Sequence, residues 1–209
     1  MRDVEIHDLL ESATGEELDL PTYRADFRRR LLSGGDSWKL ERQQSFEEPG
    51  FASWDAMARG DWAESLRLME KERPGLRQAA RENALHGTVF HRVRVVGEPL
   101  TAYLQWELHL LALRAEHGDR IRVVTPADVA DREAGAPLPE LVSVGRDTLY
   151  RVLYDSRGVL VGAVRHVDPE AVERYVRYVS GLYAGGEDLA SYFRREIATL
   201  PPPRLECHR

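Results

Sequence analysis

The chain has 209 residues, 43% of them hydrophobic and 31% charged, which is enough to bury the core of one globular domain. No apolar run approaches the roughly 20 residues that cross a bilayer, and the acidic, interrupted first residues differ from a signal peptide. The single cysteine, Cys207, excludes an internal disulfide framework and predicts a cytoplasmic location. The net charge of -6 argues against direct nucleic-acid binding unless a local basic patch provides it.

Residues 1–36 are predicted to form an N-terminal arm that contains a basic helix. Carboxylates dominate residues 1–20, and the segment from Arg24 to Arg30 is strongly basic. The simplest interpretation is a mobile acidic leader before an exposed helix. Two alternatives remain: the acidic part folds back on the basic part, or the basic part docks a partner. A single domain is predicted over 37–200, followed by a flexible tail at 201–209.

The first part of this domain is predicted to be mainly helical. An extended piece from Trp38 to Phe46 comes first, and then apolar residues at helical spacing predict two short helices divided at Gly60. Asp61 is the expected N-cap of the second helix. A third helix is predicted from Pro74 to about Leu85.

The strongest pattern lies at 89–124, which is predicted to be a strand, a helix and a second strand. Apolar and charged residues alternate over 89–95 and again over 121–124, as half-buried strands require. Pro99 suits the first turn of the intervening helix, and Gly118 suits its C-terminal cap. A strand–helix–strand unit makes a right-handed crossover, so the two strands should be parallel neighbours.

The C-terminal part is predicted to hold a hairpin and helices. After a loop-like stretch, residues 147–154 and 159–166 read as two strands, with Gly158 in the turn. The second strand is almost wholly apolar, which places it centrally in the sheet. Helices follow over 168–183 and 188–200. The fold class is therefore α/β, or α+β, with a mixed sheet of about four to six strands.

The helix over 100–116 carries charges inside its apolar surface. Glu107 and Arg114 fall within the apolar arc, beside Tyr103. Buried charges are costly unless paired, so each should meet a counter-charge. One interpretation is a purely structural ion pair; the other is that Glu107 and Tyr103 reach the mouth of a pocket.

Arginines alternate with apolar residues in both strands of the central unit. If Val93 and Ile121 face the helix, the arginines should share the opposite face; they are Arg92, Arg94, Arg120 and Arg122. Clustered guanidinium groups recognise carboxylates or phosphates. The competing interpretations are a solvated sheet face and ion pairs with acidic segments.

The sequence lacks the signatures of common catalytic and cofactor sites. It contains neither GxxxxGK[ST] nor GxGxxG, no HExxH or CxxC, and no GxSxG. We therefore predict no catalytic residue, no metal site and no cofactor.

The segment RVRVVGEPLTAYLQWEL, from Arg92 to Leu108, resembles the core of an uncharacterised actinobacterial domain family. That family is typically encoded beside small XRE-type helix-turn-helix regulators, so the resemblance implies a regulatory context and a regulator protein as a possible partner. A weaker similarity is to one half of a phospholipase D-like fold. That family's catalytic HxK is missing, since His91 is followed by Arg92 and Val93, which implies a pseudoenzyme at most.

We therefore predict a non-enzymatic regulatory or ligand-sensing module that acts through a protein partner or a small anionic ligand. The predicted binding site is Arg94, Glu98, Tyr103, Glu107 and Arg122, which cluster near the strand ends where open α/β sheets bind ligands. The alternative is a small biosynthetic enzyme that uses a buried glutamate as general base in an arginine-lined pocket.

Overall fold

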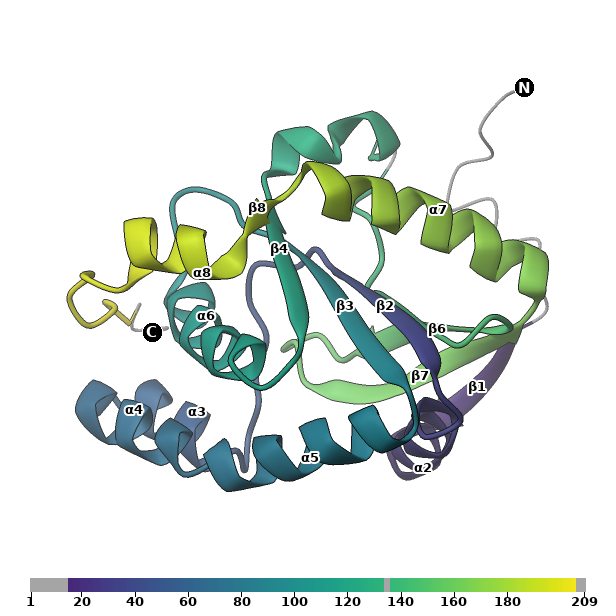
Figure 1. Cartoon of the computed structure of the whole chain (residues 1–209). Helices are drawn as coiled ribbons and strands as arrows, with labels where there is room; N and C mark the ends of the chain where they lie inside the picture. Colours follow the sequence, from purple (N-terminus) through teal and green to yellow (C-terminus); the bar gives the residue numbers. More distant parts are fainter. Residues whose placement is uncertain (1–14, 134–135, 206–209) are drawn as a thin grey trace.

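A computed structural model describes residues 15–133 and 136–205 (Figure 1). The strands are β1 (Gly15–Asp19), β2 (Gly35–Glu41), β3 (Thr88–Val95), β4 (Arg120–Val124), β5 (Leu141–Val144), β6 (Thr148–Tyr154), β7 (Leu160–Val167) and β8 (Glu187–Asp188). The helices are α2 (Leu20–Leu31), α3 (Ala52–Ala58), α4 (Trp62–Glu70), α5 (Arg73–Leu85), α6 (Ala102–Ala115), α7 (Pro169–Gly185) and α8 (Leu189–Tyr192). Two 3-10 turns (Pro126–Asp128 and Ala130–Arg132) follow β4, and a π-helical turn (Phe193–Ile197) follows α8. Within the described residues, no helix is both long and apolar enough to cross a membrane.

One mixed sheet of eight strands forms the centre of the molecule, in the order β1-β7-β6-β5-β2-β3-β4-β8. β2, β3 and β4 are parallel, and the other pairings are antiparallel. The α/β class and the parallel β3–α6–β4 unit are confirmed. The predicted four to six strands are too few, because three short strands carry no sequence pattern of their own. They are β1, β5 and β8, and β5 lies in the segment that was predicted to be a loop.

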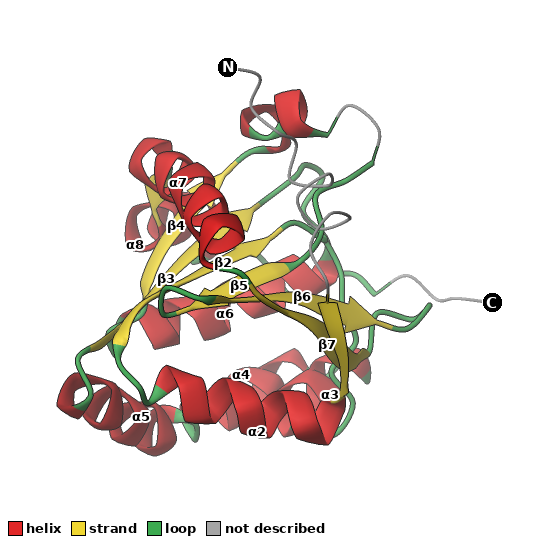
Figure 2. Ribbon diagram, turned by 90° about the vertical axis from the view of Figure 1, so that its right-hand side faces the viewer, coloured by secondary structure: helices red, strands yellow, loops and turns green. Residues whose placement is uncertain are grey.

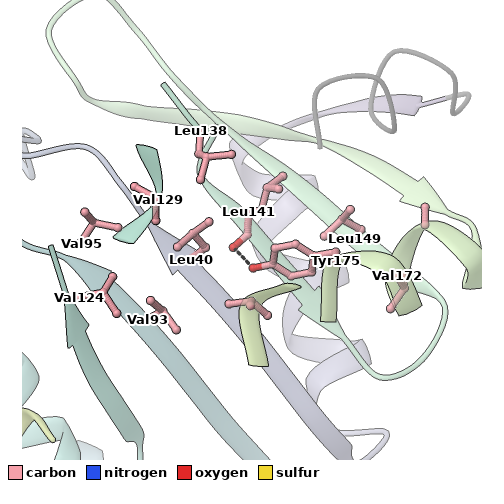
Figure 3. Close-up of a cluster of buried hydrophobic side chains, with 12 residues drawn as sticks. Leu40, Val93, Val95, Val124, Val129, Leu138, Leu141, Leu149, Val172 and Tyr175 are labelled. Atoms are coloured by element: carbon pink, nitrogen blue, oxygen red, sulfur yellow. Dashed lines mark hydrogen bonds between the residues drawn. The ribbon is translucent and has the colours of Figure 1, made fainter. Parts of the chain in front are cut away.

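Helices cover both faces of the sheet (Figure 2). α7 lies across one face, and α2, α3, α4, α5 and α6 lie on the other. Beneath α7, Leu40 and Val93 from the parallel strands pack against Val172 and Tyr175 (Figure 3). The Tyr175 hydroxyl donates hydrogen bonds to the carbonyl oxygens of Leu141, at 2.9 Å, and Trp38, at 3.2 Å. These bonds tie α7 to β5 and β2.

The opposite face has separate apolar cores under its helices. α2 covers one of them, where the rings of Tyr23 and Tyr150 meet edge to face with centroids 5.2 Å apart. α6 contributes to two more: Leu104 and Leu108 pack against β4 and α8, whereas Trp106 packs against α3 and α4. The middle of this face, between these cores, is where charged residues of β2 and β3 lie.

Several predicted helix ends are confirmed. The Asp61 carboxylate accepts the Glu64 backbone N–H at 3.1 Å, as an N-cap does. Gly118 follows α6 with a φ of +108°, which favours glycine. Pro99, however, does not start α6. The Glu98–Pro99 peptide is cis, and Thr101 is the cap, its hydroxyl oxygen accepting the Leu104 N–H at 3.0 Å.

The described part of the N-terminal region, from Gly15, takes part in the same sheet as the residues that follow it. β1 is an edge strand paired with β7, α2 packs on the sheet, and β2 already begins at Gly35. β7 is therefore second from the edge rather than central. Val161 of β7 is 44% exposed, so the prediction that this strand is covered on both faces is wrong.

Candidate ligand-binding pocket

A group of charged side chains is buried in the middle of the sheet face that α6 covers. Its members, which we call the buried ionic cluster, are Lys39, Glu41, Arg92, Arg94 and Glu107. In the parallel register Lys39 is opposite Arg92, and Glu41 is opposite Arg94. Residues that are opposite in register point to the same face, so four of these charges project together toward the helices.

Each acid of the cluster meets arginine or lysine. Arg94 Nε donates to Glu107 at 2.7 Å, and the Arg94 side chain is fully buried. Its Nη1 also donates to the carbonyl oxygens of Glu41 and Val95, both at 3.2 Å. Glu41 forms ion pairs with both Lys39 and Arg92. The cluster therefore joins β2, β3 and α6 through charge-assisted hydrogen bonds.

Tyr103 extends the cluster toward the segment before α3. Its hydroxyl lies 2.8 Å from a Glu48 oxygen and 3.2 Å from Glu107 Oε1. Burial, reinforced by the charge of Glu107, raises the pKa of Tyr103 well above its usual value. Burial also raises the pKa of Glu48, because a desolvated carboxylate is less stable than the neutral acid.

The pKa values of the acids differ because their partners differ. Burial alone would raise the pKa of Glu41, but Arg92, Lys39 and Arg94 together hold it well below its usual value. Burial and the nearby Glu41 charge instead raise the pKa of Glu140 to about 7. Glu140 Oε1 accepts the backbone N–H groups of Arg42, at 2.8 Å, and Gln43, at 2.6 Å. These two hydrogen bonds only partly offset the burial.

A cavity of about 550 Å³ lies between α2, α5 and the sheet, next to this cluster. Figure 2 shows α2 and α5 on the same face of the sheet. The cavity is lined by Tyr23, Phe27, Arg28, Leu31, Leu32, Lys39, Gly75, Gln78, Ala79, Glu82, Asn83, Phe90, Arg92, Arg114, Asp119 and Val142. We call it the α2–α5 pocket. Its volume is in the range of about 300–1,000 Å³ that is typical of small-molecule sites.

The α2–α5 pocket has an apolar part and a cationic part. Tyr23, Phe27 and Phe90 supply aromatic surface, while Lys39 and Arg92 from the sheet supply the positive charge. α5, which forms one side, has no buried residue along its described length. α5 is held to the core through Leu76, which is partly buried against the cluster that contains Trp106.

The structure brings together three of the five predicted site residues. Glu107 contacts both Arg94 and Tyr103 and is only 4% exposed. Glu98 is exposed in the loop before α6. Arg122 lies over the Tyr183 ring, 5.4 Å from its centroid, and 3.8 Å from Asp188. None of the five is among the described residues that line the α2–α5 pocket.

The predicted arginine face does not form. Arg92 is opposite Ile121, and Arg94 is opposite Val123, so these arginines share a face with apolar residues of β4. Arg122 is opposite Val93 and faces α7 instead. The sequence pattern is the same for either register, but a shift of one residue exchanges the faces of a whole strand.

Sequence reasoning missed the cationic end of the pocket. Lys39 and Glu41 alternate with Trp38 and Leu40, which was the available signal for a strand with charges on one face. The prediction that Glu107 and Arg114 would meet counter-charges is confirmed, by Arg94 for Glu107 and by Asp119, at 2.8 Å, for Arg114. In the described part of the chain, no three His, Cys, Asp or Glu residues gather as metal ligands.

Residues 25–194 match the family model described as a domain of unknown function, DUF6879. The chain belongs to this family. The match covers most of the sequence, including both sides of the α2–α5 pocket, and it agrees with the expectation of an uncharacterised family. No curated protein matches the sequence.

Among solved structures, the chain is similar to TrmBL2, an archaeal chromatin protein described as showing a novel mode of DNA binding. The TM-score is 0.40 at 9% identity, with 85% of this chain and 55% of that chain covered, so this chain spans about half of that protein's length. The predicted partners were a helix-turn-helix regulator protein or a small anionic ligand, with direct nucleic-acid binding argued against. This match to a DNA-binding protein contradicts that prediction.

Proposed function

We propose that this DUF6879 protein is a non-enzymatic, ligand-sensing module that binds a small molecule in the α2–α5 pocket. The observation that carries the proposal is the cavity itself, with Lys39 and Arg92 at its sheet side and aromatic side chains around it. An apolar concavity with a few convergent polar groups is the usual form of a small-molecule site.

The position of the pocket suits a sensing role. Arg92 and Lys39 both line the pocket and both pair with Glu41, whose backbone carbonyl accepts from Arg94. A ligand that binds to Lys39 or Arg92 therefore acts on residues linked to α6 through the Arg94–Glu107 pair. α5 forms one side of the pocket and has no fully buried residue, so a ligand in the pocket would contact a helix held mainly by Leu76 and by surface ion pairs.

The alternative function, an enzyme with a buried glutamate as general base, receives less support. Glu107 is bound to Arg94 and is not part of the pocket lining. A general base must come within hydrogen-bond reach of its substrate. The regulatory gene context, the likeness to half of a phospholipase D-like fold and the cytoplasmic location stay predictions from the sequence.

The proposal is tested by a thermal-shift screen against carboxylic acids, phosphate esters, sugar phosphates, nucleotides and amino acids. A ligand at about 100 times its Kd should raise the free energy of unfolding by about 2.7 kcal/mol. Ala79 lines the pocket from α5, so Ala79→Trp should abolish the shift. Arg77 is exposed on the same helix, outside the lining, so Arg77→Trp should leave the shift unchanged.

Two results would overturn the proposal. One is a screen in which no compound stabilises the protein. The other is a stabilising compound whose effect is the same in the wild type and in Ala79→Trp.

A further inference from the structure

The cations that line the α2–α5 pocket are not equally compensated. Arg28 at its rim lies 3.8 Å from Glu82, and Arg114 lies 2.8 Å from Asp119, so each of these arginines has its own acid. All four of these residues line the pocket. Their charges cancel in pairs.

Lys39 and Arg92 share a single acid. Both pair with Glu41, and within the described residues no other ion pair to either is formed. Counted by direct ion pairs, two positive charges meet one negative charge on the sheet side of the pocket; Asp119 and Glu107 act on Arg92 only from beyond ion-pair distance. Burial makes this excess costly, because a desolvated charge needs a counter-charge.

One hydrogen-bond donor of Arg92 is also unpaired among the described residues. Its side chain is 9% exposed, and its Nε has no acceptor among the described residues. A buried donor without an acceptor costs free energy, so the Arg92 guanidinium is incompletely satisfied by Glu41 alone. The Lys39 ammonium has three N–H donors, and in the described part of the chain its one ion pair is with Glu41.

The remaining lining is mostly apolar, with Gln78 and Asn83 of α5 as its polar side chains. Three aromatic rings are joined by Leu31, Leu32 and Val142, from α2 and β5. The ligand body that fits this surface is a hydrocarbon chain or an aromatic ring, since apolar area is stabilised by leaving water.

From the unmatched charge at Lys39 and Arg92 beside this apolar wall, we infer that the ligand is an acyl or aryl monocarboxylate. The inference rests on the proposed function. Its carboxylate lies against the Lys39 ammonium and the Arg92 guanidinium, and its hydrocarbon part lies among Tyr23, Phe27 and Phe90. A phosphate monoester carries about -1.5 to -2 charges at pH 7, which exceeds the single charge that the pocket lacks.

The experiment is isothermal titration calorimetry of the full chain with three probes of similar shape. 3-Phenylpropanoate carries one negative charge, 3-phenylpropanamide carries none, and phenyl phosphate carries more than one. Octanoate serves as the acyl counterpart. We expect the two carboxylates to bind at least about tenfold more tightly than the amide, because hydrogen bonds to charged groups are the stronger ones.

Lys39→Gln removes the excess charge and keeps the Arg92–Glu41 pair. It should weaken carboxylate binding about tenfold or more and leave amide binding unchanged. Arg28→Gln is the matched control, since it removes a lining charge that already has its own acid. Ala79→Trp should abolish binding of every probe. The comparison of acid with amide on the wild type holds even if a variant does not fold.

The outcomes separate this inference from the proposed function. In one outcome, the amide or phenyl phosphate binds as tightly as the carboxylates, and this binding is lost in Ala79→Trp. That result would refute the monocarboxylate as ligand and support the pocket as the binding site. Carboxylate binding that is unchanged in Lys39→Gln would also overturn the monocarboxylate. If none of the four probes binds, the inference that the ligand is a monocarboxylate is wrong. The thermal-shift screen then tests whether the pocket binds any small molecule.

Discussion

Replacing Arg94 by methionine tests whether the buried ionic cluster holds the fold together. Arg94 is fully buried, donates to Glu107 at 2.7 Å, and donates to two backbone carbonyl oxygens. Methionine has a similar length, so the change removes the charge and leaves little empty space. Glu107, 4% exposed, would then be a buried carboxylate without an arginine.

The expected cost follows from that isolation. Removing one partner of a buried pair costs about 3–5 kcal/mol, because the other charge stays buried and uncompensated. In a domain of this size such a loss lowers the Tm by roughly 6–20 °C. Arg94→Met/Glu107→Leu should cost less than Arg94→Met alone, since it leaves no unpaired charge.

Urea unfolding of the wild type and the variants measures these differences. Arg28→Met is the matched control, because the Arg28 side chain is 74% exposed and its removal should change stability by less than about 0.5 kcal/mol. A loss below about 1 kcal/mol in Arg94→Met, or a double variant that is less stable than Arg94→Met, would refute this account of the cluster.

Three further changes test separate parts of the structure. Because the pKa of Glu140 is about 7 in the folded protein, against 4.5 ordinarily, the folded state holds the proton longer and stability should fall by about 3 kcal/mol as pH rises through that window. Glu140→Gln should reduce the difference in the free energy of unfolding between pH 5 and pH 8, measured with urea. An unchanged difference would contradict the attribution of this pH dependence to Glu140. Gly162→Ala places a Cβ against the carbonyl oxygen of Leu18, so hydrogen exchange over 15–19 should speed up while the parallel strands keep their protection. Tyr175→Phe removes the hydrogen bonds to Leu141 and Trp38 and should lower the free energy of unfolding by about 1–2 kcal/mol, whereas Tyr183→Phe, on the same helix, should not.

The sequence was most informative where periodicity and caps agreed. The alternation over 89–95, the apolar arc of α6 and Gly118 all point to one βαβ unit, and that unit is present. The expectation that Glu107 needs a counter-charge also holds, since the cost of an unpaired buried charge does not depend on the fold. These features are local, or follow from a general energetic rule.

The features that the sequence could not supply are long-range. The partner of Glu107 is Arg94 because of the way α6 lies on β3, and the separation of Arg92 from Arg122 depends on a one-residue register. β1 was missed because its five residues have only one buried side chain and gain their order from β7. The α2–α5 pocket joins residues up to 119 positions apart, from Tyr23 to Val142, so no single stretch contains its pattern.

A crystal structure with bound 3-(4-bromophenyl)propanoate tests the central claim most directly, because the bromine gives an anomalous signal that locates the ligand. The account predicts a bromine peak between α2 and α5, among Tyr23, Phe27 and Phe90, with the carboxylate about 3 Å from Lys39 Nζ and from the Arg92 guanidinium. A peak elsewhere on the molecule, an empty α2–α5 pocket, or a carboxylate turned away from Lys39 and Arg92 would contradict it.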